Sequence, residues 1–501
     1  MKDQPGAPMD KRSVLTNTDF GKRIAEDERN ELDSYFVQTE QWQGVFSGEI
    51  DVVYGPKGSG KSAIYSLLIR KSSELFNRGI LVVPGEDVIG TSPVFSELLD
   101  GGLATEEQLR GLWKLYFLSL LAFQFREHRI SNSNSRNMIR HLEDAGLVPA
   151  QLSLRRILRS TMEYIKRLKL NTEVKLNPLT GLPEALGGSI TLGEPTTEQR
   201  ELGFVSADEL FGFADAALSE ASLKVWIVLD RLDVAFIDSP ELETKALRSL
   251  FRTYRDLAPF TNIAIKIFMR DDIWTQITEQ GFREASHITR YTKLSWDERS
   301  LLHLVISRVL HNAWIRTSCG IAEGTVLSRE EQERLFYRIF PSQIVTGKGS
   351  ATFKWMLSRT CDSTKQTAPR DLIHLLSSAR SKQLQHLELG APEPAGELLI
   401  DRNAFDEALE DVSKERFDKT LCAEHAALAP RMRALEGQKT QHSAKSLARV
   451  WGVDEERAKT EAKKLVEIGF FEKRTNQAGE ASFWVPFVYR SALKLLQGQA
   501  R

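Results

Sequence analysis

Short apolar runs alternate with longer segments of helical periodicity up to about residue 296. These runs predict strands within residues 48–54, 80–87, 223–229, 262–270 and 291–296. Continuous hydrophobicity, as in VWIVL, is typical of parallel strands that are covered on both faces. Because the strands alternate with helices, we predict an α/β fold with a parallel sheet as the middle of three layers.

Glycine, proline and polar clusters indicate where further parts begin and end. SNSNSRN and LGGSITLGEPT bound an insertion, and ELGAPEPAGE has the composition of a linker. Near the end, a short helix, a turn, a second helix and two strands around NQAGE form the pattern of a winged helix. The predicted parts are an N-terminal helical segment packed on the core (1–47), the α/β core (48–296) with an insertion at about 130–200, a helical lid (297–387), a linker with connecting helices (388–430) and a winged-helix domain (431–501).

Composition and charge narrow the class of protein. The 67 Lys plus Arg and 68 Asp plus Glu nearly cancel, which excludes a disordered tail protein or a uniformly basic nucleic-acid coat. The most apolar stretch, 115–125, is about half of the ~20 residues that a membrane span needs. The N-terminus has no apolar signal region, and the three distant cysteines have no metal-ligand spacing. We therefore expect a cytoplasmic protein with reduced thiols and no membrane contact.

The most specific motif is GPKGSGKS at 55–62. It follows the first predicted strand and precedes an apolar helical run, the order that a phosphate-binding P-loop requires. Its glycines allow successive N–H groups to point at phosphate oxygens, and the new helix adds its positive end. Lys61 is expected to reach the β- and γ-phosphates and Ser62 to ligate Mg²⁺. The predicted nucleotide ligands are Gly55, Pro56, Lys57, Gly58, Ser59, Gly60, Lys61 and Ser62.

Carboxylates follow a buried strand in LDRLD, at 229–233. We expect Asp230 at the carboxyl end of this strand, beside the P-loop, where it would hold Mg²⁺ together with Ser62. Asp233 is the candidate that polarises the attacking water. A helix N-cap or an ion pair with Arg231 stays open as the alternative role of Asp233.

Arginines near the next strand ends are candidates for contacts with the γ-phosphate. Arg270 ends its strand where a guanidinium could sense that phosphate, although an ion pair with Asp271 or Asp272 is an equally open interpretation. Arg283 and Arg290 could act in trans on a neighbouring subunit, but surface ion pairs are the stronger interpretation for both.

A proline in the predicted lid places one more arginine. Pro369 suits the first turn of a helix, so Arg370 would face the nucleotide from that helix N-terminus. An ion pair with Asp371 is the alternative. We include Arg370 with Asp233 and Arg270 among the candidate catalytic residues.

The C-terminal segment is basic but mixed in charge. From residue 431 onward it has 14 Lys plus Arg against 8 Asp plus Glu. The surplus favours contact with phosphate, whereas the glutamates interleaved on the second helix would repel a DNA backbone. DNA binding and protein docking both stay open. In the DNA hypothesis the phosphate contacts are Lys459, Lys463, Lys464, Lys473 and Arg474.

The combination of GPKGSGKS, LDRLD, the strand that ends in Arg270, the lid and the winged helix resembles the STAND and origin-recognition-like branches of the AAA+ P-loop ATPases. It looks most similar to prokaryotic STAND-like ATPases with a segment such as FGKRIAEDERNELDSYFV. The resemblance covers roughly residues 20–490. It implies ATP and Mg²⁺ as ligands, the sensor-one position for Arg270, the sensor-two position for Arg370, and self-association when nucleotide is bound.

Two departures from that family change the expected function. The acidic motif DxxD lacks the adjacent DE pair of many AAA+ motors, which implies slow turnover. The chain also has no recognisable sensor repeats or effector domain, so a partner protein would supply the output. Our first hypothesis is a switch ATPase in bacterial signalling or anti-phage defence. The alternatives are a DNA-binding ATPase that loads or remodels other factors and, last, a small-molecule kinase.

Overall fold

The computed structural model describes residues 10–22, 36–85, 105–148, 153–170, 190–232, 239–279, 282–347, 349–363, 365–475 and 481–500. These residues belong to two compact units. The first unit contains Met1–Val37, Lys57–Gly60 and Ser295–Arg501, and the second contains Gln38–Pro56 and Lys61–Leu294. Among the described residues, no helix is long and apolar enough to cross a membrane.

The second unit is built on a five-stranded parallel sheet in the order β2-β5-β6-β1-β7. The prediction of an α/β fold with a parallel central sheet is therefore confirmed. In this order, β6 lies between the P-loop strand β1 and the strand β5 that precedes Asp230. The strands are β1 (Val52–Gly55), β2 (Ile80–Pro84), β5 (Lys224–Leu229), β6 (Ile263–Arg270) and β7 (Tyr291–Lys293).

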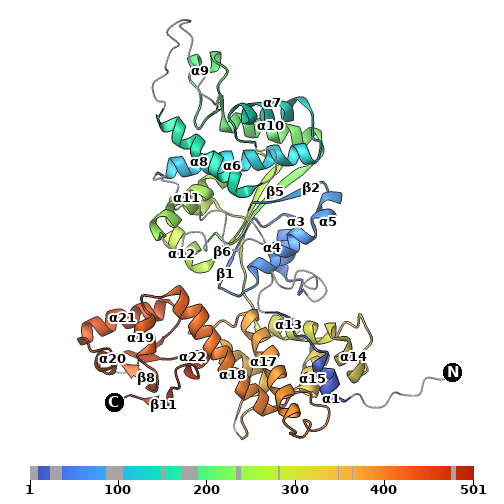
Figure 1. Cartoon of the computed structure of the whole chain (residues 1–501), viewed down its shortest axis with the longest axis vertical. Coiled ribbons are helices and arrows are strands. Elements are labelled where there is room, and N and C mark those ends of the chain that lie inside the picture. Colours follow the sequence, from blue (N-terminus) through green and yellow to red (C-terminus); the bar gives the residue numbers. More distant parts are fainter. Residues whose placement is uncertain are drawn as a thin grey trace, which may run out of the picture. The chain divides into compact units, whose positions relative to one another are not determined.

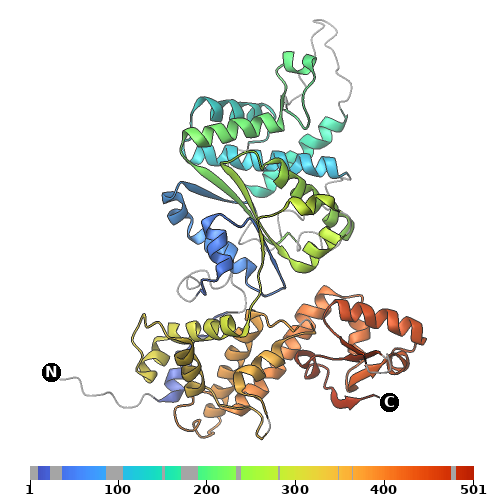
Figure 2. The ribbon, with the colours of Figure 1, turned by 180° about the vertical axis from the view of Figure 1, so that it is seen from behind.

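Helices cover both faces of this sheet, as Figure 1 shows and Figure 2 confirms from behind. Alternate residues of β6 divide between the faces: Ile267 joins the large apolar core under α6, while Phe268 meets Tyr65 of α4 with ring centroids 6.0 Å apart. The helices of this unit are α3 (Glu40–Ser47), α4 (Lys61–Arg70), α5 (Ser72–Asn77), α6 (Glu106–Glu127), α10 (Ala207–Glu220), α11 (Pro240–Asp256), α12 (Asp271–Glu279) and the 3-10 helix η4 (Arg283–His287).

In its described residues, the predicted insertion at about 130–200 packs into the apolar core of the second unit. Its polar start is a helix cap, because Asn132 accepts a hydrogen bond from the N–H of Ser135 at the start of α7 (Ser133–Asp144). Helix α8 (Leu154–Leu170) buries Ile157 and Leu158 in the same core as α6. The periodic apolar face of α8 therefore completes the helix layer. Short elements follow at β3 (Ile190–Thr191), α9 (Thr197–Glu201) and β4 (Val205–Ser206).

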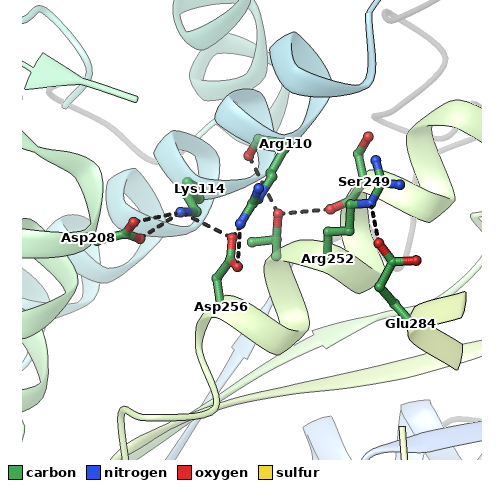
Figure 3. Close-up of polar contacts among 8 residues, drawn as sticks. Arg110, Lys114, Asp208, Ser249, Arg252, Asp256 and Glu284 are labelled. Atoms are coloured by element: carbon green, nitrogen blue, oxygen red, sulfur yellow. Dashed lines mark hydrogen bonds and ion pairs between the residues drawn. The ribbon is translucent and has the colours of Figure 1, made fainter. Parts of the chain in front are cut away.

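Ion pairs fasten this helix layer together (Figure 3). Lys114 of α6 is buried, and its Nζ lies 2.7 Å from an oxygen of Asp208 in α10 and 3.1 Å from an oxygen of Asp256 in α11. Arg110, one turn before it, donates two hydrogen bonds to Asp256. One turn before Asp256 on α11, Arg252 pairs with Glu284 at 3.2 Å. These ion pairs hold α6, α10 and α11 together on one face of the sheet, and the sequence did not predict them.

The larger part of the first unit is helical. Its core joins α13 (Glu298–His311), α14 (Ala313–Cys319), α15 (Arg329–Ile339), α16 (Thr352–Thr360), α17 (Pro369–Glu388) and α18 (Arg402–Glu415). Helix α1 (Lys11–Thr16) belongs here too, since Val14 and Leu15 are buried in this core. For its described residues before Val37, the expectation that 1–47 packs on the α/β core was therefore wrong.

The segment 388–430, predicted as a linker with connecting helices, contains helix α18 at 402–415. This helix packs on α17. Phe405, Ala408 and Val412 recur at helical spacing and are fully buried with the lid helices. The stretch 388–397 therefore lies in the connection between α17 and α18, two helices that share the lid core.

The remainder of the first unit, residues 416–500, has its own apolar core, and we call it the C-terminal subdomain. It starts with a π-helix and contains two helices joined at Gly452, followed by an antiparallel strand pair in a sheet of order β11-β8-β10-β9. Its elements are η5 (Arg416–Cys422), α19 (Ala429–Arg433), β8 (Lys439–Ser443), α20 (Ala444–Trp451), α21 (Glu455–Glu467), β9 (Glu472–Thr475), β10 (Ala481–Trp484), α22 (Phe487–Arg490) and β11 (Leu496–Gln499).

Candidate functional site

The GPKGSGKS segment forms a tight loop between β1 and α4. Gly58 and Gly60 have φ angles of 81° and 104°, in the region that favours glycine. Gly58 also has little space, since an added Cβ would lie 3.2 Å from the Cβ of Arg370 and 3.3 Å from the Cβ of Ala368. The loop tip Lys57–Gly60 belongs to the first unit, as do both of these neighbours. The conformation therefore requires glycine for its backbone angle and for its packing.

Lys61, at the start of α4, curls back over its own loop. Its Nζ donates hydrogen bonds to the carbonyl oxygens of Gly55 at 2.8 Å and Pro56 at 2.9 Å. The first turn of α4 carries no acidic residue, so the positive end of the helix is not neutralised from within that turn. This arrangement suits an anionic ligand.

Two further features of the loop support that fit. Ser59 is 1% exposed, and its Oγ has no hydrogen-bond partner, an expensive arrangement for a buried hydroxyl. Trp296 donates its indole N–H to the carbonyl oxygen of Ser59 at 2.7 Å. Sequence reasoning placed Trp296 in a strand and missed this contact, because a lone tryptophan carries no signal of its partner. The loop thus fits a nucleotide phosphate, with Lys61 and Ser62 as its polar side chains.

Arg270 lies beside the loop. It is the register partner of Gly55 in the parallel pairing of β6 with β1, so the sheet brings it to the first glycine of the motif. Its Nε and Nη2 donate to the two carboxylate oxygens of Asp272 at 3.0 and 2.7 Å. Of the two interpretations that the sequence left open, the ion pair with Asp272 is present in the structure. A phosphate role for Arg270 stays a prediction.

Asp230 is buried and directly follows Leu229, the last residue of β5. Leu229 pairs with Ile267, three residues before the end of β6, so Asp230 sits further back from the loop edge than Arg270 does. Arg231 then adopts a φ of 58°, an uncommon conformation for a residue with a side chain. Asp233, our candidate for the hydrolytic acid, lies outside the described residues.

Arg370 is at the second position of α17 and packs against Gly58, as described above. Asp371, its proposed partner, instead forms an ion pair with Arg416 at 3.3 Å. The structure therefore brings Arg370 to the loop tip within the first unit. The sensor-two role itself stays a prediction.

The two arginines considered for action in trans have different outcomes. Arg290 donates through Nε to the carbonyl oxygen of Glu49 at 3.1 Å and lies 3.2 Å from Asp51, so it is held against the start of β1 in its own chain. The side chain of Arg283 lies outside the described residues. Of the two, Arg290 thus follows the ion-pair interpretation.

A buried ion pair anchors the strand that leads into the loop. Lys266 of β6 is fully buried, and its Nζ is 2.7 Å from an oxygen of Asp51 and 4.4 Å from the ring centroid of Trp226. Burial lowers the pKa of Lys266, and the charge of Asp51 opposes that shift. The pair fixes β1 against β6 and hence Gly55 against Arg270.

The described residues contain no group of three or more His, Cys, Asp or Glu side chains that could hold a metal ion. A magnesium ion in a P-loop does not need such a cage, because it is held largely by phosphate oxygens and water. Ser62 and Asp230, the predicted side chains for Mg²⁺, are compatible with that arrangement and stay a prediction.

Comparison with known proteins gives a weak likeness only. No protein-family model and no curated protein matches the chain. Among solved structures, Cdc6p from Pyrobaculum aerophilum is 13% identical, with a TM-score of 0.29 over 97% of this chain and 98% of that one. The ORC2 protein of Aeropyrum pernix in its ADP form is also 13% identical, with a TM-score of 0.32 over 97% of each chain. These values are too low to assign the chain to either protein's family or to transfer a function.

Proposed function

We propose that this protein is a nucleotide-controlled switch, which binds ATP with Mg²⁺ at the GPKGSGKS loop and hydrolyses it slowly. The observation that carries the proposal is the form of the GPKGSGKS loop. Gly58 and Gly60 have positive φ angles, the buried Oγ of Ser59 has no hydrogen-bond partner, and Lys61 donates to the carbonyl oxygens of its own loop. A glycine-containing loop of this kind at the start of a helix suits the phosphates of a nucleotide.

Each residue has a distinct task in this proposal. Lys61 exchanges its two carbonyl acceptors for phosphate oxygens, a stronger charge-assisted bond. Ser62 and Asp230 hold Mg²⁺, which neutralises phosphate charge when it is bound. Asp233 orients the attacking water, and the absence of a second acid next to Asp230 favours slow turnover. Arg270 gives up Asp272 when it binds the γ-phosphate.

The experiment that tests this function compares ATP, ADP and a non-hydrolysable ATP analogue with the full-length protein. We expect Mg²⁺-dependent binding of all three, hydrolysis of ATP at a few turnovers per minute or slower, and a larger assembly with the analogue than with ADP, measured by light scattering after gel filtration. Absence of nucleotide binding would refute the proposal. The resemblance noted in the sequence suggests a role in bacterial signalling or anti-phage defence with a partner effector, which co-purification from the native host would test.

A specific observation also favours the second function, a DNA-binding ATPase with a C-terminal winged helix. Lys463 and Lys464 on α21 are exposed, and within the described residues neither forms an ion pair. Lys459, by contrast, pairs with Glu456 at 2.7 Å. At the strand pair, Arg474 stacks 4.0 Å from the ring centroid of Trp484 while it binds Glu472. Unpaired lysines on α21 and a stacked arginine in β9 are side chains that suit a phosphate backbone.

A salt titration of DNA binding separates the two functions. If the winged helix binds DNA, affinity falls steeply with salt, and the double substitution Lys463→Glu and Lys464→Glu abolishes it. Because Lys459 pairs with Glu455 and Glu456, we no longer include it among the proposed phosphate contacts, and Lys459→Glu is the matched control. Equal, weak binding by all three proteins would remove the DNA function and leave the switch.

A further inference from the structure

One short segment of the C-terminal subdomain touches the nucleotide loop and the lid helix beside it. The segment runs from Arg416 to Glu424 and begins with the seven-residue π-helix η5. π-helical turns are rare and occur often at functional sites, because the extra residue per turn redirects side chains. Arg416 at the start of the segment and Glu424 at its end carry opposite charges and form ion pairs with different partners.

Arg416, at the first end, is largely buried and forms two ion pairs. Its side chain is 14% exposed and lies 3.3 Å from Asp371 of α17 and 3.4 Å from Asp362. The charge of Asp371 raises the pKa of Arg416, so the guanidinium stays charged. A buried ion pair of this kind adds little stability over apolar packing, but it fixes one geometry. Arg416 therefore holds the segment against the N-terminus of α17, next to Arg370.

Glu424, at the second end, forms an ion pair with Lys57. Both side chains are partly shielded, with relative exposures of 21% for Glu424 and 36% for Lys57. Lys57 is in the loop tip Lys57–Gly60, which belongs to the same unit as the C-terminal subdomain. A carboxylate is thus bound to a lysine of the loop that we expect to take phosphate.

We propose that the Lys57–Glu424 ion pair is an autoinhibitory latch that nucleotide binding opens, and that Arg416 is the residue that positions it. A triphosphate brings several negative charges to the loop, which attract Lys57 and repel Glu424. The ion pair and the bound phosphates therefore exclude each other, and release of Glu424 frees the segment 416–424 and the subdomain that follows it. This inference rests on the proposed nucleotide site and adds its regulation.

Glu424→Gln tests the latch, because it removes the charge and keeps the shape. We expect its Kd for ATP to fall roughly two- to fivefold, the range of a partly exposed ion pair. The matched control is Asp418→Asn, which removes one negative charge from the same segment but from a carboxylate bound to Arg433 at 2.7 Å. The control should bind ATP as the wild type does.

Hydrogen exchange of the amides at 416–434 is a second measurement. A change in ATP affinity alone would not alter the exchange rates of the free protein. In the wild type and in Asp418→Asn, ATP should speed exchange in this segment severalfold. In Glu424→Gln, exchange should be fast without ATP and change little when ATP is added. Arg416→Lys keeps the charge but not the forked geometry, so we expect it to shift exchange in the same direction as Glu424→Gln.

The outcomes distinguish the latch from the site on which it depends. Wild-type protein that binds no ATP would overturn both the proposed function and the latch. Normal ATP binding, with Glu424→Gln and Asp418→Asn indistinguishable in affinity and in exchange, would overturn the latch and leave the nucleotide site intact. A two- to fivefold gain in Glu424→Gln together with loss of the ATP-dependent exchange would support it.

Discussion

Gly58→Ala is the sharpest test of the packing between the P-loop and the start of α17. The substitution has two costs. The backbone φ of 81° is unfavourable for any residue with a Cβ, by about 1–2 kcal/mol. The new methyl group would also lie 3.2 and 3.3 Å from two Cβ atoms, closer than the optimum of about 3.5–4.0 Å. Cβ atoms cannot rotate away, so relief requires a backbone shift that costs about 1–3 kcal/mol.

The two costs can be separated with a matched glycine. Gly146 has a φ of 72°, and an added Cβ there would meet nothing within 4 Å. Gly146→Ala should therefore lower the free energy of unfolding by about 1–2 kcal/mol and leave nucleotide binding unchanged. Gly58→Ala adds the steric cost, so its combined strain is at least about 2 kcal/mol, which corresponds to a roughly 30-fold weaker Kd for ATP if the bound loop carries it.

The assay is titration calorimetry with ATP and Mg²⁺, together with urea unfolding of both variants. Gly58→Ala that binds ATP within threefold of the wild type would refute the argument that the loop needs glycine against Arg370 and Ala368. Equal loss of binding in both variants would show that general destabilisation, and not the local contact, is the cause.

Three further predictions concern residues of the second unit, which contains the parallel sheet. Lys61→Ala should abolish ATP binding with little change in the urea midpoint, because its Nζ supplies charge to the phosphates and its hydrogen bonds to the carbonyl oxygens of Gly55 and Pro56 lie within its own loop. Unchanged affinity in the folded variant would contradict the P-loop assignment. Asp233→Asn should bind ATP but lose turnover by orders of magnitude in a phosphate-release assay, whereas a block by Asp230→Asn alone would reverse the two roles. Lys266→Ala should cost about 3 kcal/mol in urea unfolding, since it leaves the buried Asp51 without its closest cation, and a loss below about 1 kcal/mol would show that other partners suffice.

The parallel sheet was predictable from sequence because its strands are apolar on both faces and each is short. VWIVL at 225–229 and the start of IAIKIFM at 263–269 carry that signal without help from distant residues. The order of the strands was not predictable in the same way. Hydrophobicity says that β5 and β6 are buried, but it does not say that β6 lies between β5 and β1. Adjacency is a long-range property, and the motif LDRLD contains no residue that specifies it.

Local composition did not show which segments pack back onto a core. ELGAPEPAGE has the residues of a linker, yet the helix after it returns to α17 because Phe405, Ala408 and Val412 complete one apolar face. The polar run before α7 was similarly ambiguous, since asparagine and serine are favoured both in loops and at helix N-caps. Turn-forming residues thus locate the end of an element correctly while leaving open whether the chain departs from the core or folds back onto it.

The candidate site shows the same division at the level of single residues. Gly55, Lys61 and Ser62 could be named as candidates from the sequence, because a P-loop places its chemistry in one contiguous segment. Trp296 and Glu424 could not, because each contacts the loop from a segment more than 200 residues away in sequence. Arg416 could not either, because its partner Asp371 is on another helix and neither residue belongs to a motif. Charge pairing also changes what the predicted residues do before any ligand arrives: Arg270 is bound to Asp272 and Lys57 to Glu424. In the proposed function a bound nucleotide would displace a carboxylate at each of these positions, so its binding free energy would depend on ion pairs that the motif does not contain.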